Sequence, residues 1–227
     1  MKKFLLSIAI FLLFSTQTFS HVEHYDKYNY LEYELFRNNK SIGYHKYEFN
    51  RQNKNLSISS EVSFKITKLG VDLYNYYARS VENYEKGIFK NYSSKTKQNK
   101  KDRYVDIKLD NSKNELTIDG SSYKGRTSKE FIVGTWWNHE IIKAKAQISG
   151  ISGRIIHQTV TFVGKEEIKI GEKTYKTLRF NFRSSDETLP DSKKLNTDIW
   201  YEEGTYLWVK ASFDKTGHWE YRLKKIN

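Results

Sequence analysis

Residues 56–67, LSISSEVSFKIT, alternate between polar and apolar side chains without a change of phase. Every odd position is polar, and every even position is apolar except Ser60. A period of two is typical of a β-strand that turns one face to a core. Such a segment spans about 40 Å, whereas an ordinary strand has only about five or six residues. The pattern therefore predicts a strand long enough to wrap around a strongly curved sheet.

The same period recurs along most of the chain, with turn-forming residues between the segments. Further strands are predicted at residues 28–37, 41–50, 71–85, 88–96, 103–109, 114–119, 154–163, 166–170, 173–183, 197–203, 205–213 and 218–226. Because twist accumulates from strand to strand, about ten antiparallel strands in meander order cannot stay flat. We therefore predict an all-β fold, a single curved antiparallel meander sheet that forms an open barrel or clam.

Two other β architectures compete with this prediction. A plain β-sandwich would also accept the alternation of residues 56–67. A membrane barrel would need an apolar outward face, but the outward positions of this segment are Ser, Glu, Lys and Thr. The period fails between residues 127 and 153, where residues 138–149 suggest at most one short helix, with Asn138 as its N-cap and Gly150 beyond its end.

The N-terminus has the pattern of a secretory signal peptide. Lys2 and Lys3 precede an apolar run at residues 4–14, and Thr18, Phe19 and Ser20 form an acceptable cleavage site. A buried N-terminal helix is the alternative. We expect residues 1–20 to be the signal and residues 21–227 to form a single β-rich domain. The chain has no cysteine, so we expect an exported, soluble protein, periplasmic or secreted, that is not a lipoprotein.

The charge of the chain favours an anionic partner. It carries 39 Lys and Arg against 27 Asp and Glu, a net charge of +12. Such a balance suits lipid, lipopolysaccharide or acidic glycans, although the composition is also that of a protein from an AT-rich genome. Export makes nucleic acid the least suitable anion. The densest basic run is predicted to be a hairpin tip that contacts an anionic surface, or else a solvated loop, and consists of Lys95, Lys97, Lys100, Lys101 and Arg103.

Few residues suggest catalytic or metal chemistry. His21 and His24 are weak metal candidates at the expected mature N-terminus, where a solvated chain end is the alternative. His139 and Glu140 are the one acid–base pair that we nominate. No phosphate-binding loop has the required glycine spacing. We expect no cofactor and no enzymatic activity, and residues 184–197 are either a lid or an indifferent loop.

A curved sheet can enclose an apolar pocket, which is the default binding site in such a fold. The predicted inward residues that would line it are Val62, Phe64, Ile66, Phe180, Phe182 and Trp137. If the sheet closes tightly, the same side chains form a core instead. The first reading predicts a protein that binds or shields an acyl chain or lipid. The second predicts a filled β-domain that serves as an interaction or assembly module of the envelope.

Several short motifs resemble a family of exported bacterial proteins known only as a domain of unknown function. In chain order they are Ile42-Gly43-Tyr44-His45, Trp137-Asn138, Ser152-Gly153, Trp200-Tyr201-Glu202-Glu203-Gly204 and Tyr221. Glu202 departs from the Asp expected after the Trp-Tyr pair. The resemblance covers residues 28–225 and implies no catalytic role. More distantly, the layout is similar to half-barrels that carry lipids or lipoproteins across the periplasm.

Overall fold

The computed structural model describes residues 25–227, so the predicted signal peptide and the candidates His21 and His24 lie outside the described residues. Fifteen strands form one sheet. The first eight are β1 (Tyr30–Arg37), β2 (Lys40–Gln52), β3 (Asn55–Lys68), β4 (Val71–Glu85), β5 (Ile88–Gln98), β6 (Lys101–Asp110), β7 (Glu115–Gly120) and β8 (Lys124–Ser128). The others are β9 (Ile132–Val133), β10 (Ala146–Ile148), β11 (Ile155–Ile170), β12 (Lys173–Ser184), β13 (Asn196–Glu202), β14 (Trp208–Asp214) and β15 (His218–Ile226).

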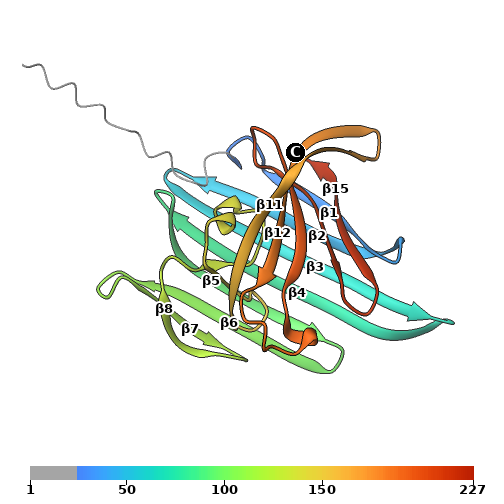
Figure 1. Cartoon of the computed structure of the whole chain (residues 1–227). Helices are drawn as coiled ribbons and strands as arrows, with labels where there is room; N and C mark the ends of the chain where they lie inside the picture. The colour runs from blue at the N-terminus through green and yellow to red at the C-terminus, as the bar shows by residue number, and fades with distance from the viewer. Residues whose placement is uncertain (1–24) are drawn as a thin grey trace, which may run out of the picture.

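The sheet consists of two meanders joined through the first and last strands. Strands β1 to β8 follow one another, β9 to β15 follow one another, and β1 pairs with β15 in the middle of the sheet. All pairs are antiparallel except β9 with β10. The prediction of an all-β, mostly antiparallel meander that stays open is therefore confirmed. Figure 1 shows β11 and β12 crossing over the long strands β3 and β4.

The two edges of the open sheet are held near one another by the chain itself. Strand β8 ends at Ser128 and β9 begins at Ile132 on the opposite edge. Three linking residues reach at most about 14 Å between those positions, so the sheet must curl until its edges approach. From β9 the chain continues through residues 134–154 before β11, and this crossing segment covers part of the concave face.

Helical structure in the described residues is limited to 3₁₀ turns such as η2 (His139–Ile142) and η3 (Asp191–Lys193). The predicted N-cap of the first is confirmed, because the Asn138 side chain accepts a hydrogen bond from the backbone N–H of Glu140 at 3.1 Å. The remainder of the predicted helix is β10 and its connections. All three residues of β10 pair with β11, and Gln147 and Ile148 also pair with β9, instead of forming further helical turns.

An aromatic core fills one part of the concave face. Leu31, Tyr33 and Leu35 of β1 are fully buried, as the period of two requires. The ring of Tyr33 stacks on that of Trp208 with centroids 3.9 Å apart, and its hydroxyl donates to the Trp208 carbonyl. Side chains of this size each contribute about 1.5–3 kcal/mol when fully buried. This packing fixes the half of the sheet that surrounds the β1–β15 junction.

Candidate functional site

The concave face has a patch of small side chains where three long strands lie side by side. On β3, β4 and β5 two successive rows face inward, and each row is in direct cross-strand register. The first row is Ser60, Ser80 and Ser94, and the second is Val62, Ala78 and Thr96. Large side chains such as Ile58 and Phe64 flank the rows on β3. Protein interiors are close-packed, so six small residues together leave a hollow that their neighbours on the rigid sheet do not fill.

This hollow is the base of a cleft of about 250 Å³, half-enclosed and mostly apolar. Aromatic rings stand around it, contributed by Tyr47, Tyr76, Tyr92, Trp136 and Tyr221. The crossing segment covers it from the other side with residues that include Gly134, Gln147, Ser149 and Ile151. The cleft is therefore built between the long strands and the one part of the chain without a strand period.

Hydrogen bonds from tyrosines on the sheet fix the position of the crossing segment. The Tyr47 hydroxyl donates to the Thr135 carbonyl at 2.7 Å, and the Tyr201 hydroxyl donates to the Trp136 carbonyl at 2.9 Å. Between these two anchors Trp136 has a φ of +56°, a conformation that a bulky residue rarely adopts. Tyr92 donates to the Gly150 carbonyl farther along the segment, at 3.0 Å. The cover is thus held in a defined position before any ligand arrives.

His45 places a neutral imidazole at the edge of the cleft. Its Nε2 lies 2.8 Å from the Ser60 hydroxyl, and its ring lies 4.3 Å from that of Tyr47. Burial lowers the pKa of His45 to about 3, so the ring is uncharged near neutral pH. Its Nδ1 is buried and has no hydrogen-bond partner among the described residues. A buried polar atom without a partner is costly, but this one is closed off from solvent, so a ligand in the cleft cannot reach it.

The His45–Ser60 pair also resembles the base and nucleophile of a hydrolase, but its surroundings argue against that role. A catalytic imidazole is oriented by an acid on its second nitrogen, and no carboxylate bonds to Nδ1 of His45 among the described residues. A base with a pKa of about 3 also accepts a proton poorly near neutral pH. The pair is better suited to hydrogen bonding than to proton transfer.

Glu82 is a buried carboxyl beside the cleft. It accepts hydrogen bonds from the Tyr84 hydroxyl at 2.5 Å, from Trp137 Nε1 at 3.0 Å and from the Thr135 hydroxyl at 3.4 Å. Burial raises the pKa of Glu82 to about 7, although these three hydrogen bonds oppose the rise. Thr135 belongs to the crossing segment and lines the cleft, so Glu82 contacts the crossing segment through this hydrogen bond.

Of the six predicted pocket residues, one lines the cleft and five pack in hydrophobic clusters. Only Val62 lines the cleft, and a ligand-binding role for it stays a prediction. Phe64 packs with the cluster around Trp219, and Ile66 lies at the margin of the same cluster. The remaining three belong to the main core or pack against it, and they are Phe180, Phe182 and Trp137. These five side chains fill space instead of bounding it.

At the Trp pair, the ring that lines the cleft belongs to the residue before the predicted one. Trp137, the predicted pocket residue, is fully buried and donates to Glu82, whereas Trp136 lines the cleft. His139 Nε2 lies 3.3 Å from Glu140 Oε1, and the His139 ring stacks on Tyr206. Neither residue lines the cleft. Within residues 25–227 no group of three metal-ligating side chains is close enough to hold a metal ion.

Of the six small residues that make the cleft, sequence reasoning named only Val62. The available signal was Ser60, the single break in the alternation of β3. Its partners across the sheet, Ser80 and Ser94, carry the same signal, but their alignment depends on strand register.

The basic run occupies the predicted kind of position. Lys100 lies at the turn between β5 and β6, flanked by Lys97 and Lys101, whose side chains are exposed. Lys95 is exposed on β5, and Arg103 is half-buried on β6, where its Nε donates to Gln98. Contact with an anionic surface stays a prediction for these five residues.

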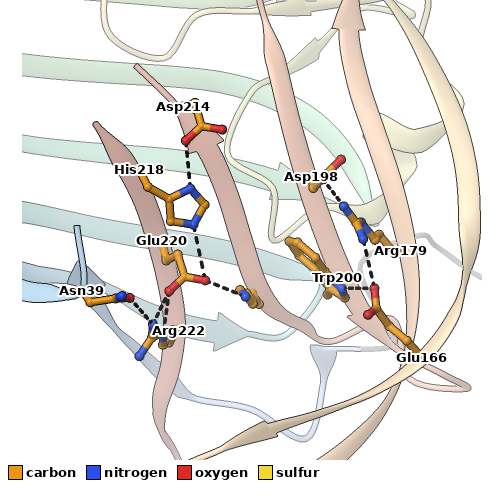
Figure 2. A network of polar contacts seen from close by, with 10 residues as sticks. Asn39, Glu166, Arg179, Asp198, Trp200, Asp214, His218, Glu220 and Arg222 are labelled. Atoms are coloured by element: carbon orange, nitrogen blue, oxygen red, sulfur yellow. Dashed lines mark hydrogen bonds and ion pairs between the residues drawn. The ribbon is translucent and has the colours of Figure 1, made fainter. Parts of the chain in front are cut away.

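A second polar constellation lies on the outer face of the sheet (Figure 2). The Trp200 ring lies between the guanidinium of Arg179 and the ammonium of Lys210, which are 4.9 and 4.8 Å from its centroid. Arg179 pairs with Asp198 at 2.5 Å, and Trp200 Nε1 donates to Glu166 at 2.7 Å. These contacts join β11, β12, β13 and β14.

The constellation continues onto β15 through Glu220. This carboxylate pairs with Lys210 at 2.6 Å and with Arg222, and His218 lies between it and Asp214. Burial favours the neutral acid, but the hydrogen bonds from Lys210 and Arg222 outweigh it and lower the pKa of Glu220. Each carboxylate drawn in Figure 2 has a cationic or hydrogen-bonding partner, so we interpret the group as a clamp between strands.

Comparison with known proteins assigns the chain to a sequence family. Residues 33–224 match the sequence pattern of DUF6134, a domain of unknown function. The chain belongs to the DUF6134 family. The predicted membership of a family of unknown function is thus confirmed. A comparison of the DUF6134 chain with curated proteins finds no match.

The fold of the DUF6134 chain is shared by a solved structure. A β-barrel-like protein of the domain of unknown function DUF1849 from Brucella abortus matches with a TM-score of 0.59 and 11% identity, over 87% of this chain and 96% of that one. This similarity shows the fold alone. A DUF1329 family protein from Desulfovibrio piger aligns over 91% of this chain and 89% of its own, at 9% identity. Its TM-score of 0.27 is too low to indicate a shared fold. Among the described residues of the DUF6134 chain, no helix has the length and apolar character needed to cross a membrane.

Proposed function

We propose that the DUF6134 chain is a non-enzymatic binding protein of the cell envelope that holds the end of one acyl chain in the concave cleft. One observation carries the proposal: two aligned rows of small side chains leave a half-enclosed cleft of about 250 Å³ on a concave face that is otherwise packed. Its aromatic sides suit an apolar chain, and the Ser60, Ser80 and Ser94 hydroxyls suit a polar group attached to it.

The size of the cleft limits the ligand. A volume of about 250 Å³ holds about eight groups of the size of a water molecule, which corresponds to a short chain or the end of a longer one. Burial of about eight methylene groups contributes about 6 kcal/mol, and the cost of association removes a large part of it. Binding should therefore be weak and reversible, as a carrier or sensor requires.

The polar end of the ligand should be uncharged. His45 is neutral, and Arg79, the one charged residue at the cleft, is paired with Glu61 at 2.9 Å. An ester, amide or hydroxyl group could bond to the hydroxyls of Ser60, Ser80 and Ser94, which line the cleft. A monoacylglycerol with an eight-carbon chain combines these features and is a suitable probe.

Filling the cleft tests the proposal. Ser80→Leu adds an apolar side chain inside the cleft, and Ser59→Leu adds the same side chain at an exposed position of neighbouring β3. Tryptophan fluorescence titrated with the monoacylglycerol should show binding that Ser80→Leu weakens at least tenfold and Ser59→Leu leaves unchanged. Thermal unfolding checks that both variants are folded. Equal binding by both variants, or no binding by the wild type together with no lipid in mass spectra of protein from its own host, would refute the proposal.

The packed half of the concave face favours a second candidate, an envelope interaction module that needs no ligand. Twenty-one buried residues form the main core around the β1–β15 junction. In that case Ser80→Leu would leave the phenotype of a chromosomal variant unchanged, because only the outer surface would matter. The same variant therefore separates the two functions.

A further inference from the structure

The hairpin of β3 and β4 extends beyond the sheet that supports it. Pairing between β2 and β3 stops at Phe64, and pairing between β4 and β5 begins at Tyr76. Residues 65–75 therefore have their strand partners only within the hairpin, and we call them the tip ribbon. Figure 1 shows this hairpin reaching past the ends of the neighbouring strands. A two-stranded ribbon has little stability of its own. Ile66 and Tyr74 near its base pack against the cluster around Trp219, and the side chains at its end differ from them in exposure.

The tip ribbon exposes large apolar side chains at its end. Leu69 is 95% exposed, Val71 is 61% exposed and Leu73 is 55% exposed. Leu69 occupies the turn with a φ of +50°, next to Gly70. Single exposed apolar residues are ordinary, but a cluster at a projecting point marks a contact site.

Basic side chains surround this apolar end. Lys65 and Lys68 lie on the ribbon itself. The turn between β5 and β6 lies against the base of the ribbon, because Asn75 and Asn99 exchange hydrogen bonds at 2.7 and 2.8 Å. That turn adds Lys100 and its basic neighbours. Residues 65–75 and 97–103 together hold six basic and two acidic side chains, and one of the acids, Asp72, is bound to Lys65 and Thr67.

We propose that the tip ribbon docks the protein on a bilayer of anionic phospholipid. Leu69, Val71 and Leu73 enter the boundary between headgroups and acyl chains, and the lysines of the ribbon and the adjacent turn contact the phosphates. Apolar side chains next to basic ones are the combination that holds peripheral proteins on such surfaces. A protein partner fits less well, because a stable interface needs about 800 Å² on each side and the tip ribbon is a narrow projection.

Docking through the tip ribbon would hold the cleft at a fixed distance from the bilayer surface. Val62 in the cleft is seven residues from Leu69 on the same hairpin, which corresponds to about 23 Å. The docking inference goes beyond the cleft proposal and does not depend on it, because the ribbon can bind a bilayer whether or not the cleft holds a ligand.

The chain contains no cysteine, so one introduced cysteine can carry an environment-sensitive fluorophore. Leu69→Cys reports on the tip ribbon, and Ile88→Cys, 55% exposed at the opposite end of the hairpin axis, is the matched control. Both are mixed with vesicles of phosphatidylglycerol and phosphatidylcholine in equal amounts, and with vesicles of phosphatidylcholine alone. We expect a blue shift at position 69 with the anionic vesicles only, and none at position 88.

Sedimentation with the same vesicles gives the affinity. Changing Leu69, Val71 and Leu73 together to serine should weaken binding at least tenfold, whereas Ile88→Ser should have no effect. An unchanged signal at position 69, an equal signal at position 88, equal binding to uncharged vesicles, or full binding by the triple variant would each overturn the inference. So would self-association through position 69 without vesicles, measured by analytical ultracentrifugation.

Discussion

Replacing the buried Glu82 carboxyl with an amide should change how stability depends on pH. Glu82 is 3% exposed and accepts three hydrogen bonds, and its pKa is raised from 4.5 to about 7 because burial disfavours the charged form. Between these two values the folded protein holds a proton that the unfolded chain has released. Stability therefore falls as pH rises through this window, by about 1.4 kcal/mol per pH unit at most. The contribution is fully present below about pH 4.5 and is lost above about pH 7.

The magnitude follows from the two pKa values. Their separation corresponds to a loss of about 3 kcal/mol between acid and neutral pH. In Glu82→Gln this loss disappears. The amide keeps the shape of the side chain but can accept from only one of the Tyr84 and Trp137 donors, which costs about 1 kcal/mol. The variant should thus be less stable than the wild type by about 1 kcal/mol near pH 4 and more stable by about 2 kcal/mol near pH 8.

Urea unfolding followed by tryptophan fluorescence, repeated across this pH range, measures the difference. Glu85→Gln is the control, because Glu85 lies on the same strand, is exposed, and has a pKa lowered by its hydrogen bond with Lys90. It should show no change in pH dependence above about pH 5. If Glu82→Gln and the wild type differ by a constant amount at every pH, the argument that burial keeps this carboxyl protonated is wrong.

Two further substitutions test the sheet. Gly43→Ala should prevent correct pairing of β2 with β3, because a Cβ there would collide with the Ser63 carbonyl oxygen, and circular dichroism of the purified variant should show lost strand structure. Glu220→Gln should destabilise the protein by about 1–3 kcal/mol at neutral pH, because it leaves Lys210 and Arg222 without their carboxylate. The pKa of Glu220 is lowered, so this deficit should shrink as pH falls below about 4.5, and a deficit that persists in acid would contradict the role given to the ion pairs.

The strands were predictable because the alternation of polar and apolar side chains within each segment is a local feature of the sequence. Alternation in β1 placed Leu31, Tyr33 and Leu35 in the core, and all three are fully buried. The pairing of β1 with β15 joins residues nearly the whole domain apart, and no short-range pattern encodes it. Long-range contacts also set the orientation of the Trp pair. Hydroxyls of Tyr47 and Tyr201 hold the backbone on either side of Trp136, and this determines which ring faces the cleft.

Most of the predicted pocket residues lie in packed clusters for a general physical reason. Large apolar side chains on an inward face attract neighbours and fill the space between them, so Phe182 and Trp137 are fully buried. A cleft forms where such side chains are missing from several strands at one level. Ser60 is therefore more informative than the apolar residues around it, but only after strand register shows Ser80 and Ser94 beside it.

The β3–β4 hairpin carries both proposed sites, and its length supports the outer one. The middle of the hairpin provides the base of the cleft, and residues 65–75 continue beyond the partners available on β2 and β5. Each ordered residue costs about 1–2 kcal/mol of backbone entropy, and Leu69, Val71 and Leu73 recover little of it because they are exposed. A hairpin that ended at Phe64 and Tyr76 would support the same cleft without that cost. The tip ribbon is therefore best explained by a contact outside the molecule, with the bilayer as the partner that matches its apolar end and basic surroundings.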